Sequence, residues 1–421
     1  KIYVLANIGH KRLMNILLIN HYAGSPKHGM EYRPYYLAKE WVRMGHKVYI
    51  VASSISHLRS ISPNVTDIIS HEVIDGISYS WLKTPGYNGN GVMRAINMFS
   101  FVANLMLHAG YFTRTVRPNI VIASSTYPLD ILPARSISKR SSATLIFEVH
   151  DLWPLSPIEL GGMSPRHPFI IIMQWAENYA YKYADKVTSI LPNTKHHMVE
   201  HGMKPDKFVY IPNGISIEDW GRYNYPLPEQ HEKVLSELKR KSKFLVCYAG
   251  AHGIANALTY FIEAAKYLVN ENISFVLVGQ GPEKPRLQNL AEQLKLTNVV
   301  FLSPVNKHAI PALLDKMDCL YISLQKQNLF RFGISPNKLM DYMMAAKPII
   351  HAVEAANDMV KEANCGISVP AENPEAIASA VKQLMRMSDE QRREMGLRGK
   401  RYVMENHDYK VLARRFLESI E

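Results

Sequence analysis

A loop that opens into a helix, within residues 330–351, is the part of this chain best suited to bind phosphate. Pro336 can occupy a first helical turn, where no backbone N–H is needed, and the residues from Lys338 to Ala346 favour a helix. The free N–H groups at the start of a helix attract anions. Asp341 lies one turn further in, where its carboxylate can accept hydrogen bonds from hydroxyl groups. Phosphate beside hydroxyl groups describes the nucleoside diphosphate of an activated sugar.

A histidine follows a second apolar segment. Residues 144–149 are typical of a buried strand, and His150, Asp151 and Trp153 come directly after it. Ligands of parallel sheets gather at the carboxyl ends of the strands, so His150 is well placed for chemistry. Asp151 or Glu148 could orient its ring or tune its charge. The alternative is a histidine that is hydrogen-bonded to the backbone of its own loop.

The sequence gives no support for a metal or another cofactor. Cys247, Cys319 and Cys365 are far apart in or beside apolar segments, which indicates buried, reduced thiols of a cytosolic protein. They lack the spacing and the histidine partners of a zinc site. Because no Asp-x-Asp pair occurs either, we expect no bound metal.

Length and composition indicate a globular protein of two domains. A single core seldom extends over 421 residues, and 47% hydrophobic with 20% charged residues excludes a disordered chain. The net charge of +12 attracts nucleic acid, anionic lipid or phosphorylated substrates without distinguishing them. The basic residues are scattered, and no nucleic-acid-binding motif accompanies them. A membrane surface or an anionic lipid-linked substrate is therefore favoured over nucleic acid.

The expected location is the cytoplasm, including the inner face of the cytoplasmic membrane. No apolar run is long enough to cross a bilayer, and residues 1–13 lack the features of a signal peptide. The first convincing strand follows Met14, so residues 1–13 are expected to lie outside the fold. A long apolar helix is predicted from Val92 to Thr115. It either packs within the protein or rests on a membrane or a lipid acceptor.

Two series of alternating strands and helices position these residues. The first opens with a strand at 15–20, a loop with two glycines at 21–30, a helix at 31–44 and a strand at 47–52. Doubly wound α/β domains begin in this way. The glycines do not form the G-x-G-x-x-G motif, and no acidic residue follows the second strand, which disfavours a nicotinamide cofactor. Residues 53–90 are expected to form an irregular or antiparallel insertion.

The second series begins after residues 220–242, which are rich in proline and charge and are expected to connect the domains. Its first two strands end in the glycine loops 250–253 and 279–283. Two such series imply two similar domains with a cleft between them. We assign residues 14–219 to the first and 220–402 to the second. A C-terminal helix at about 403–421 is expected to pack back on the first domain.

The order of these segments resembles that of the GT-B-fold retaining glycosyltransferases of family 4, particularly bacterial enzymes that build cell-surface polysaccharides. The resemblance covers nearly everything after Met14. It is carried by five segments in the family's order. These are Gly24–Met30 with Glu31-Tyr32-Arg33, His150-Asp151-Leu152-Trp153-Pro154, Ile211-Pro212-Asn213-Gly214-Ile215, Gly279-Gln280-Gly281-Pro282-Glu283, and the segment from Ser335 to Met344.

The resemblance implies two Rossmann-like domains, with the donor held mainly by the C-terminal one and the acceptor by the N-terminal one. Backbone groups around Ser335, Pro336, Asn337 and Leu339 would cradle the pyrophosphate, and Asp341 would hold the ribose hydroxyls. His150, with Asp151 beside it, would lie against the transferred sugar. Further donor contacts would come from Gly24, His252, Gly279, Gly281, Glu283 and Val305, and acceptor contacts from Glu31, Arg33 and Trp153.

The sequence departs from the family pattern in two places. Gly333 stands where many members carry the first acid of an acid-x7-acid motif that ends at Asp341, so the sugar's identity stays open. The usual Arg and Lys pair after the first strand of the second domain is also missing, and His252 is the only candidate there.

Some cationic group must still offset the charge of the departing pyrophosphate. Arg331 and Lys338 flank the phosphate loop and are the candidates, with Lys326 behind them. The alternative for all three is a solvated surface charge.

The expected function is that of a retaining hexosyltransferase. It would move a sugar from a nucleotide sugar, with UDP-sugar favoured, to a hydroxyl of a lipid-linked or oligosaccharide acceptor in O-antigen, capsule or exopolysaccharide biosynthesis. Preorganised N–H groups and cations would stabilise the departing diphosphate. The alternatives are a nucleotide-sugar epimerase on the same scaffold, a non-catalytic sugar-nucleotide-binding partner, and a basic nucleic-acid-binding protein.

Overall fold

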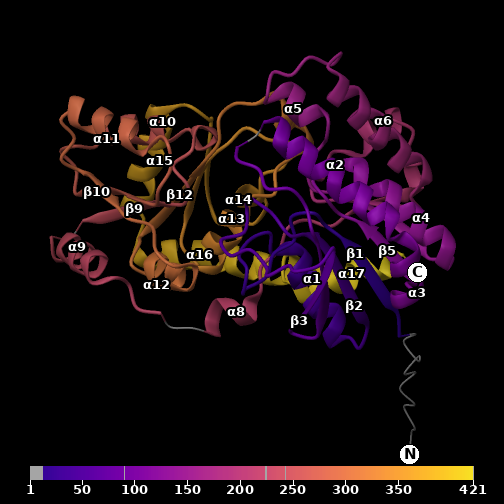
Figure 1. Ribbon diagram of the computed structural model, residues 1–421. Coiled ribbons are helices and arrows are strands. Elements are labelled where there is room, and N and C mark those ends of the chain that lie inside the picture. The colour runs from indigo at the N-terminus through magenta and orange to yellow at the C-terminus, as the bar shows by residue number, and fades with distance from the viewer. Residues whose placement is uncertain (1–12, 90, 223–224, 242, 421) are drawn as a thin grey trace, which may run out of the picture. The chain divides into compact units, whose positions relative to one another are not determined.

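The computed structural model describes residues 13–89, 91–222, 225–241 and 243–420 (Figure 1). Apart from Leu13, the predicted N-terminal extension therefore lies outside the described residues. The chain divides into two compact units. Unit 1 holds the described residues up to Ile211 and those from Leu412 on, and unit 2 holds Pro212–Val411.

Unit 1 contains an eight-stranded sheet in the order β3-β4-β2-β1-β5-β6-β7-β8. Every neighbouring pair is parallel except β3 and β4. Four residues of β1, Ile16 to Ile19, are completely buried, which explains the unbroken apolar run of a parallel strand covered on both faces. The strands are β1 Asn15–Ile19, β2 Lys47–Ser53, β3 Ile69–Ile74, β4 Ile77–Leu82, β5 Ile120–Ala123, β6 Thr144–Val149, β7 Lys186–Ser189 and β8 Phe208–Tyr210.

Helices connect these strands and cover the sheet. In Figure 1, α2, α4 and α6 lie close together, and α4 contacts both of the other helices. The chain returns to this unit at its end, where Trp41 Nε1 donates to Ala413 O at 3.0 Å and the Trp41 ring packs against Phe416. The helices are α1 Arg33–Arg43, α2 Val92–Leu107, α3 Ala109–Val116, α4 Ile131–Ser141, α5 Leu155–Glu159, α6 Pro168–Tyr183, α7 Lys195–Glu200 and the second part of α17 Tyr409–Glu418.

Unit 2 contains a six-stranded parallel sheet in the order β11-β10-β9-β12-β13-β14, that of a doubly wound α/β domain. Successive residues of β9 pack into two different cores, Cys247 on the side of α13 and Tyr248 on the side of α10 and α15. The strands are β9 Phe244–Ala249, β10 Ile273–Val278, β11 Val299–Leu302, β12 Cys319–Ser323, β13 Ile349–Ala352 and β14 Gly366–Val369.

The helices of unit 2 form the two layers that cover its sheet. The three cysteines are buried free thiols, as predicted. The helices are α8 Ile217–Arg222, α9 Glu229–Arg240, α10 Leu258–Lys266, α11 Lys284–Gln293, α12 Ile310–Asp315, α13 Asn337–Met344, α14 Met359–Glu362, α15 Pro374–Arg386 and α16 Asp389–Asn406.

The connection between the units differs from the prediction. Residues 220–242 do not simply link the domains, because α9 packs into unit 2, where Leu235 is fully buried. The chain leaves unit 1 after Ile211. Within unit 2 the outgoing and returning segments run together, since Ile215 N donates to His407 O at 2.8 Å and Tyr409 N donates to Ile215 O at 3.1 Å.

The predicted helix from Val92 to Thr115 is also corrected. It is two helices, α2 and α3, that meet at His108 with a bend of 57°. Among the described residues, no single helix has the length and apolar composition needed to span a membrane, although this bent pair would satisfy both together. In the expected insertion, β3 and β4 form an antiparallel hairpin that turns at Asp75 and Gly76.

Candidate functional site

Ser124, Glu148 and His150 form a hydrogen-bonded cluster in unit 1. β5 and β6 are parallel neighbours, with Ala123 opposite Phe147, so their carboxyl ends meet at one edge of the sheet. His150 Nε2 lies 2.9 Å from Ser124 Oγ and 3.2 Å from Glu148 Oε2. Ser124 Oγ donates to the same Glu148 oxygen at 2.7 Å. This arrangement favours a proton on Nε2 of His150, which leaves Nδ1 able to accept a hydrogen bond from a ligand.

Arg33 neutralises the buried carboxylate of Glu148. Its Nη2 and Nε atoms lie 2.9 and 3.2 Å from Glu148 Oε1, and both side chains are 1% exposed. Burial opposes ionisation of Glu148, but the charge of Arg33 and the hydrogen bonds from His150 and Ser124 lower its pKa well below the usual range. The carboxylate beside His150 is therefore ionised.

Arg33, which the resemblance assigned to the acceptor, has its partners within the protein. Its guanidinium group lies in the interior, where Nη2 also donates to Ile211 O at 2.9 Å. A buried carboxylate requires a nearby positive charge, and Arg33 supplies it. The other two predicted acceptor residues, Glu31 and Trp153, are partly exposed.

Of the two acids considered as partners of His150, Glu148 contacts the ring and Asp151 does not. The Asp151 carboxylate accepts from Leu152 N at 2.9 Å and from the Ser156 hydroxyl, so it fixes the loop that leads into α5. Burial raises the pKa of Asp151, and these hydrogen bonds oppose that rise. Asp151 shapes the segment after His150 rather than holding its imidazole.

Gly24 lies in a tight loop that follows β1, the strand beside β5. A Cβ atom here would lie 1.9 Å from the carbonyl oxygen of Gly29, so the loop accepts only glycine at this position. Gly24 N donates to Glu31 O at 2.8 Å, and Tyr79 OH donates to Gly24 O at 2.9 Å. The loop is thus held at the sheet edge that also carries His150.

In unit 2, Lys338 of α13 brings its ammonium group to the end of β9. Nζ donates to Tyr248 OH at 2.6 Å and lies 3.3 Å from Asn256 Oδ1. A Cβ atom at Gly250 would lie 2.9 Å from this Nζ, so the glycine makes room for it. Burial lowers the pKa of Lys338 to about 7. The cation lies beside the residues where the sequence lacks the expected Arg and Lys pair.

His252 cannot supply that missing charge. Its ring is fully buried, and neither ring nitrogen has a hydrogen-bond partner among the described residues. Burial, reinforced by the charges of Lys284 and Lys338, lowers its pKa to about 4. The imidazole is therefore neutral near pH 7.

The glycine loop after β10 is tied to this histidine segment. His252 N donates to Gln280 O at 2.9 Å, and Glu283 N donates to His252 O at 3.0 Å. Gly279 and Gly281 lie within this pair of loops, where they approach the backbone of residues 250–252. Lys284, which the sequence did not single out, donates to Gly279 O at 2.9 Å and to Leu302 O at 3.1 Å.

Two asparagine side chains hold the loop before α13. Asn213 donates from its backbone to Ser335 Oγ at 3.0 Å and from its side chain to Ser335 O at 2.9 Å. Asn357 accepts from Ile334 N at 2.7 Å and donates to Ile334 O at 3.0 Å. Pro336 then precedes the helix, and Asn337 and Lys338 begin it. The predicted phosphate loop is therefore fixed before any ligand arrives.

Asp341 lies on the first turns of α13. Burial raises its pKa to about 6, although Lys307 lowers it. No described residue donates a hydrogen bond to its carboxylate, which can therefore accept bonds from a ligand. The neighbouring helix residue Leu339 is buried, and Val305 packs against the same core cluster from the loop after β11.

The remaining charged candidates lie at the surface. Arg331 is exposed, donates to Asn328 O at 2.7 Å and lies over the Phe332 ring. Lys326 pairs with Glu354 at 3.1 Å, with both side chains about half exposed. Lys338 alone of the three cations is held against the end of β9.

A cavity of about 290 Å³ lies next to these loops, between α10 and α11. Gly253, Glu283 and Arg286 contribute to its wall, and Glu283 forms an ion pair with Arg286. Neither Lys338 nor Asp341 lines it, so it is not the predicted phosphate site.

Comparisons with known proteins cover most of the chain. Residues 28–219 match the family model described as Glycosyltransferase Family 4, and residues 229–402 match that of Glycosyl transferases group 1. The chain is 25% identical over 258 residues to WcaI of Escherichia coli K12, described as a putative colanic acid biosynthesis glycosyl transferase. That match spans 60% of this chain and 62% of the relative.

Solved structures share the fold at low sequence identity. HepE of Anabaena, in complex with UDP and glucose, has a TM-score of 0.64 at 14% identity, over 96% of this chain and 98% of that one. WaaG, a glycosyltransferase involved in lipopolysaccharide biosynthesis, has a TM-score of 0.64 at 14% identity, over 96% and 99% of the two chains.

Proposed function

Because this chain belongs to the GT-B-fold glycosyltransferases of family 4, we propose that it transfers a sugar from a nucleotide sugar to a hydroxyl of a saccharide or polyprenyl-diphosphate-linked acceptor. The donor is a UDP-sugar, and the transfer retains the anomeric configuration. The product belongs to bacterial surface polysaccharide, assembled at the inner face of the cytoplasmic membrane. WcaI and WaaG, whose descriptions name colanic acid and lipopolysaccharide biosynthesis, support this assignment.

The observation that carries the proposal is the position of Lys338. Breaking the bond between the anomeric carbon and the β-phosphate leaves negative charge on the departing diphosphate. An ammonium group beside the amino end of α13 stabilises that charge as it develops. The clamped backbone at Ser335 adds N–H donors that need no rearrangement during the reaction.

The pKa of Lys338 suits this role. With a pKa of about 7, the free protein holds a partly neutral lysine, and an approaching diphosphate favours its protonated form. Asp341 would accept hydrogen bonds from the ribose hydroxyls. A divalent metal is not required, because the cation and the helix end already offset the charge of the diphosphate.

The cluster around His150 is assigned to the transferred sugar. Glu148 and Ser124 hold Nε2, so Nδ1 is the atom left to accept a hydrogen bond from a sugar hydroxyl. The same-face attack of the acceptor hydroxyl, with the leaving phosphate as proton acceptor, is inferred from the family.

We assign an apolar surface on α2 to binding of the acceptor. Ile96, Phe99 and Leu107 are between 40% and 79% exposed, although the opposite face of the helix is buried. Exposed apolar side chains on a basic protein suit a lipid-linked acceptor and the anionic membrane surface that carries it.

Thermal unfolding of the full chain with nucleoside diphosphates and nucleotide sugars tests the donor site. We expect UDP and one UDP-sugar to raise the melting temperature, and Lys338→Met to reduce that rise. Product should form only when an acceptor is added, because an epimerase would convert the donor alone. Absence of stabilisation by every nucleotide would contradict the proposal, and binding with equal, negligible turnover in the wild type and in His150→Ala would indicate a non-catalytic binding protein.

A further inference from the structure

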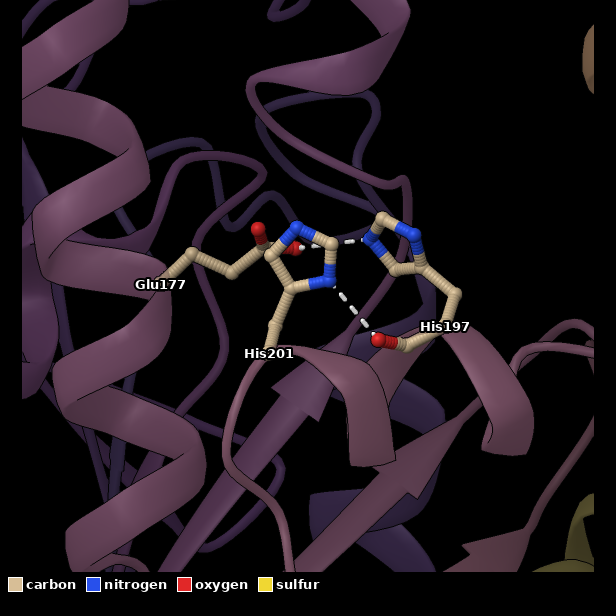
Figure 2. Close-up of side chains that lie close together, drawn as sticks. All are labelled: Glu177, His197 and His201. Atoms are coloured by element: carbon tan, nitrogen blue, oxygen red, sulfur yellow. Dashed lines mark hydrogen bonds and ion pairs between the residues drawn. The ribbon is translucent and has the colours of Figure 1, made fainter.

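Glu177, His197 and His201, none of which belongs to the hydrogen-bonded cluster of His150, come together in unit 1 (Figure 2). Glu177 lies on α6, and the two histidines lie on and just after α7, one helical turn apart. One potential ligand atom of each residue lies within 4.8 Å of the other two. His197 Nε2 is 3.7 Å from Glu177 Oε1, and the two imidazole centroids are 4.2 Å apart.

Glu177 is a buried carboxylate held by neutral groups. Its side chain is 2% exposed, and it accepts from Gln174 Nε2 at 2.7 Å and from Tyr181 OH at 2.8 Å. In the part of the chain that the structure describes, no lysine or arginine lies within ion-pair distance of it. A buried carboxylate is costly without a positive charge. A cation bound beside Glu177 would remove this cost.

The orientation of His201 favours a cation. Its Nδ1 lies 2.8 Å from His197 O, which places the ring proton on Nδ1 and leaves the lone pair on Nε2 (Figure 2). His108 makes the same contact with Asn104 O at the end of α2, so this contact alone is an ordinary helix end. At His201 it is combined with a second imidazole and a buried carboxylate. Metal-bound histidines commonly donate their other ring N–H to a backbone carbonyl, and metal-bound carboxylates are hydrogen-bonded as Glu177 is.

We propose that Glu177, His197 and His201 bind one divalent transition-metal ion, with Zn²⁺ preferred, and that the ion joins α6 to α7. Two imidazoles and one carboxylate form a known zinc ligand set, with water as the fourth ligand. The imidazoles disfavour Mg²⁺ and Ca²⁺, which prefer oxygen ligands. Bonds of about 2.0–2.1 Å in a tetrahedron place ligand atoms about 3.3 Å apart, which is close to the 3.7 Å between His197 Nε2 and Glu177 Oε1. The site is structural and independent of the sugar transfer proposed above.

The test uses the full chain, freed of metal with a chelator and titrated with Zn²⁺ by calorimetry. We expect one ion per chain, a rise in melting temperature with Zn²⁺, and a visible absorption band of a tetrahedral site when Co²⁺ is used. His201→Ala and Glu177→Gln should each weaken Zn²⁺ binding at least a hundredfold. The matched control is His196→Ala, on the same helix, because His196 pairs with Glu200 at the surface, where their side chains are 86% and 60% exposed.

The proposal fails if the folded wild type takes up no stoichiometric Zn²⁺, or if His201→Ala binds it as tightly as the wild type does. It also fails if several ions bind and no variant removes one of them, since that describes non-specific surface histidines. If Glu177→Gln does not fold, His201→Ala still decides the question, because His201 is only partly buried.

Discussion

Lys338 is held between the Tyr248 hydroxyl and the Asn256 amide oxygen, although burial disfavours its charge. A side chain kept in such a position at a cost in stability usually serves binding or catalysis. Its partners are neutral, so a bound diphosphate would provide the missing negative charge.

Lys338→Met should therefore separate activity from stability. We expect kcat to fall by about 10²-fold or more, because a charge that stabilises the leaving group is lost. The melting temperature of unit 2 should rise by about 2–4 °C, since a buried ammonium group is removed. This rise in melting temperature should be largest at or below pH 7. It should become smaller as the pH increases towards 10.5, the ordinary pKa of lysine. Lys326→Met, which changes an exposed lysine, is the control for both measurements.

The affinity for UDP should depend on pH through the same group. Below about pH 7 Lys338 is protonated in the free protein, and above it binding must take up a proton. Calorimetry from about pH 6.5 to about 8.5 should thus show affinity falling and proton uptake rising as the pH increases. Lys338→Met should remove this dependence, and an unchanged pH profile in the variant would assign it to another group.

Among the elements, the loop before α13 depends on the two asparagine clamps. Asn357→Ala should loosen the backbone at Ile334 and raise the KM for the donor by about tenfold, with a smaller effect on folding. Asn373→Ala removes the N-cap of α15 and is the matched control, because it should lower stability without changing donor affinity. Equal KM values for the two variants would show that the clamp does not shape the site.

The ion pair between Arg33 and Glu148 connects α1 to β6. Glu148→Ala should lower the free energy of unfolding by about 3–5 kcal/mol, because it leaves a buried guanidinium group without its partner. The double variant Arg33→Met with Glu148→Leu should recover most of this loss. Urea denaturation measures both, and a double variant less stable than Glu148→Ala would contradict the assigned role.

For the molecule as a whole, the net charge of +12 and the exposed side of α2 predict binding to anionic lipid. The full chain should sediment with vesicles that contain anionic phospholipid, and salt should weaken this binding. Ile96→Glu with Phe99→Glu should reduce it by about tenfold. Leu397→Glu is the control, because it changes an exposed leucine on α16 of unit 2. Equal sedimentation of the two variants would exclude the α2 surface.

Much of the architecture follows from local patterns. Unbroken apolar runs such as residues 15–20 and 244–249 are typical of parallel strands whose sheet is covered on both faces. The strands and their order along the chain were therefore predictable. The turn at Asp75 and Gly76, the buried cysteines and the helix that begins at Asn337 follow from residue chemistry in the same way. The position of His150 after β6 also needed only the strand before it.

Other features depended on contacts between residues far apart in the chain. Nothing local distinguishes Arg33 as a buried counter-charge, because its partner Glu148 is 115 residues away. Lys338 reaches Tyr248 and Asn256 only because α13 packs beside the end of β9. The break at His108 and the meeting of Glu177 with two histidines likewise arise from packing. Side-chain charge and helix periodicity are local properties, whereas burial and the choice of partner are decided when the whole chain is folded.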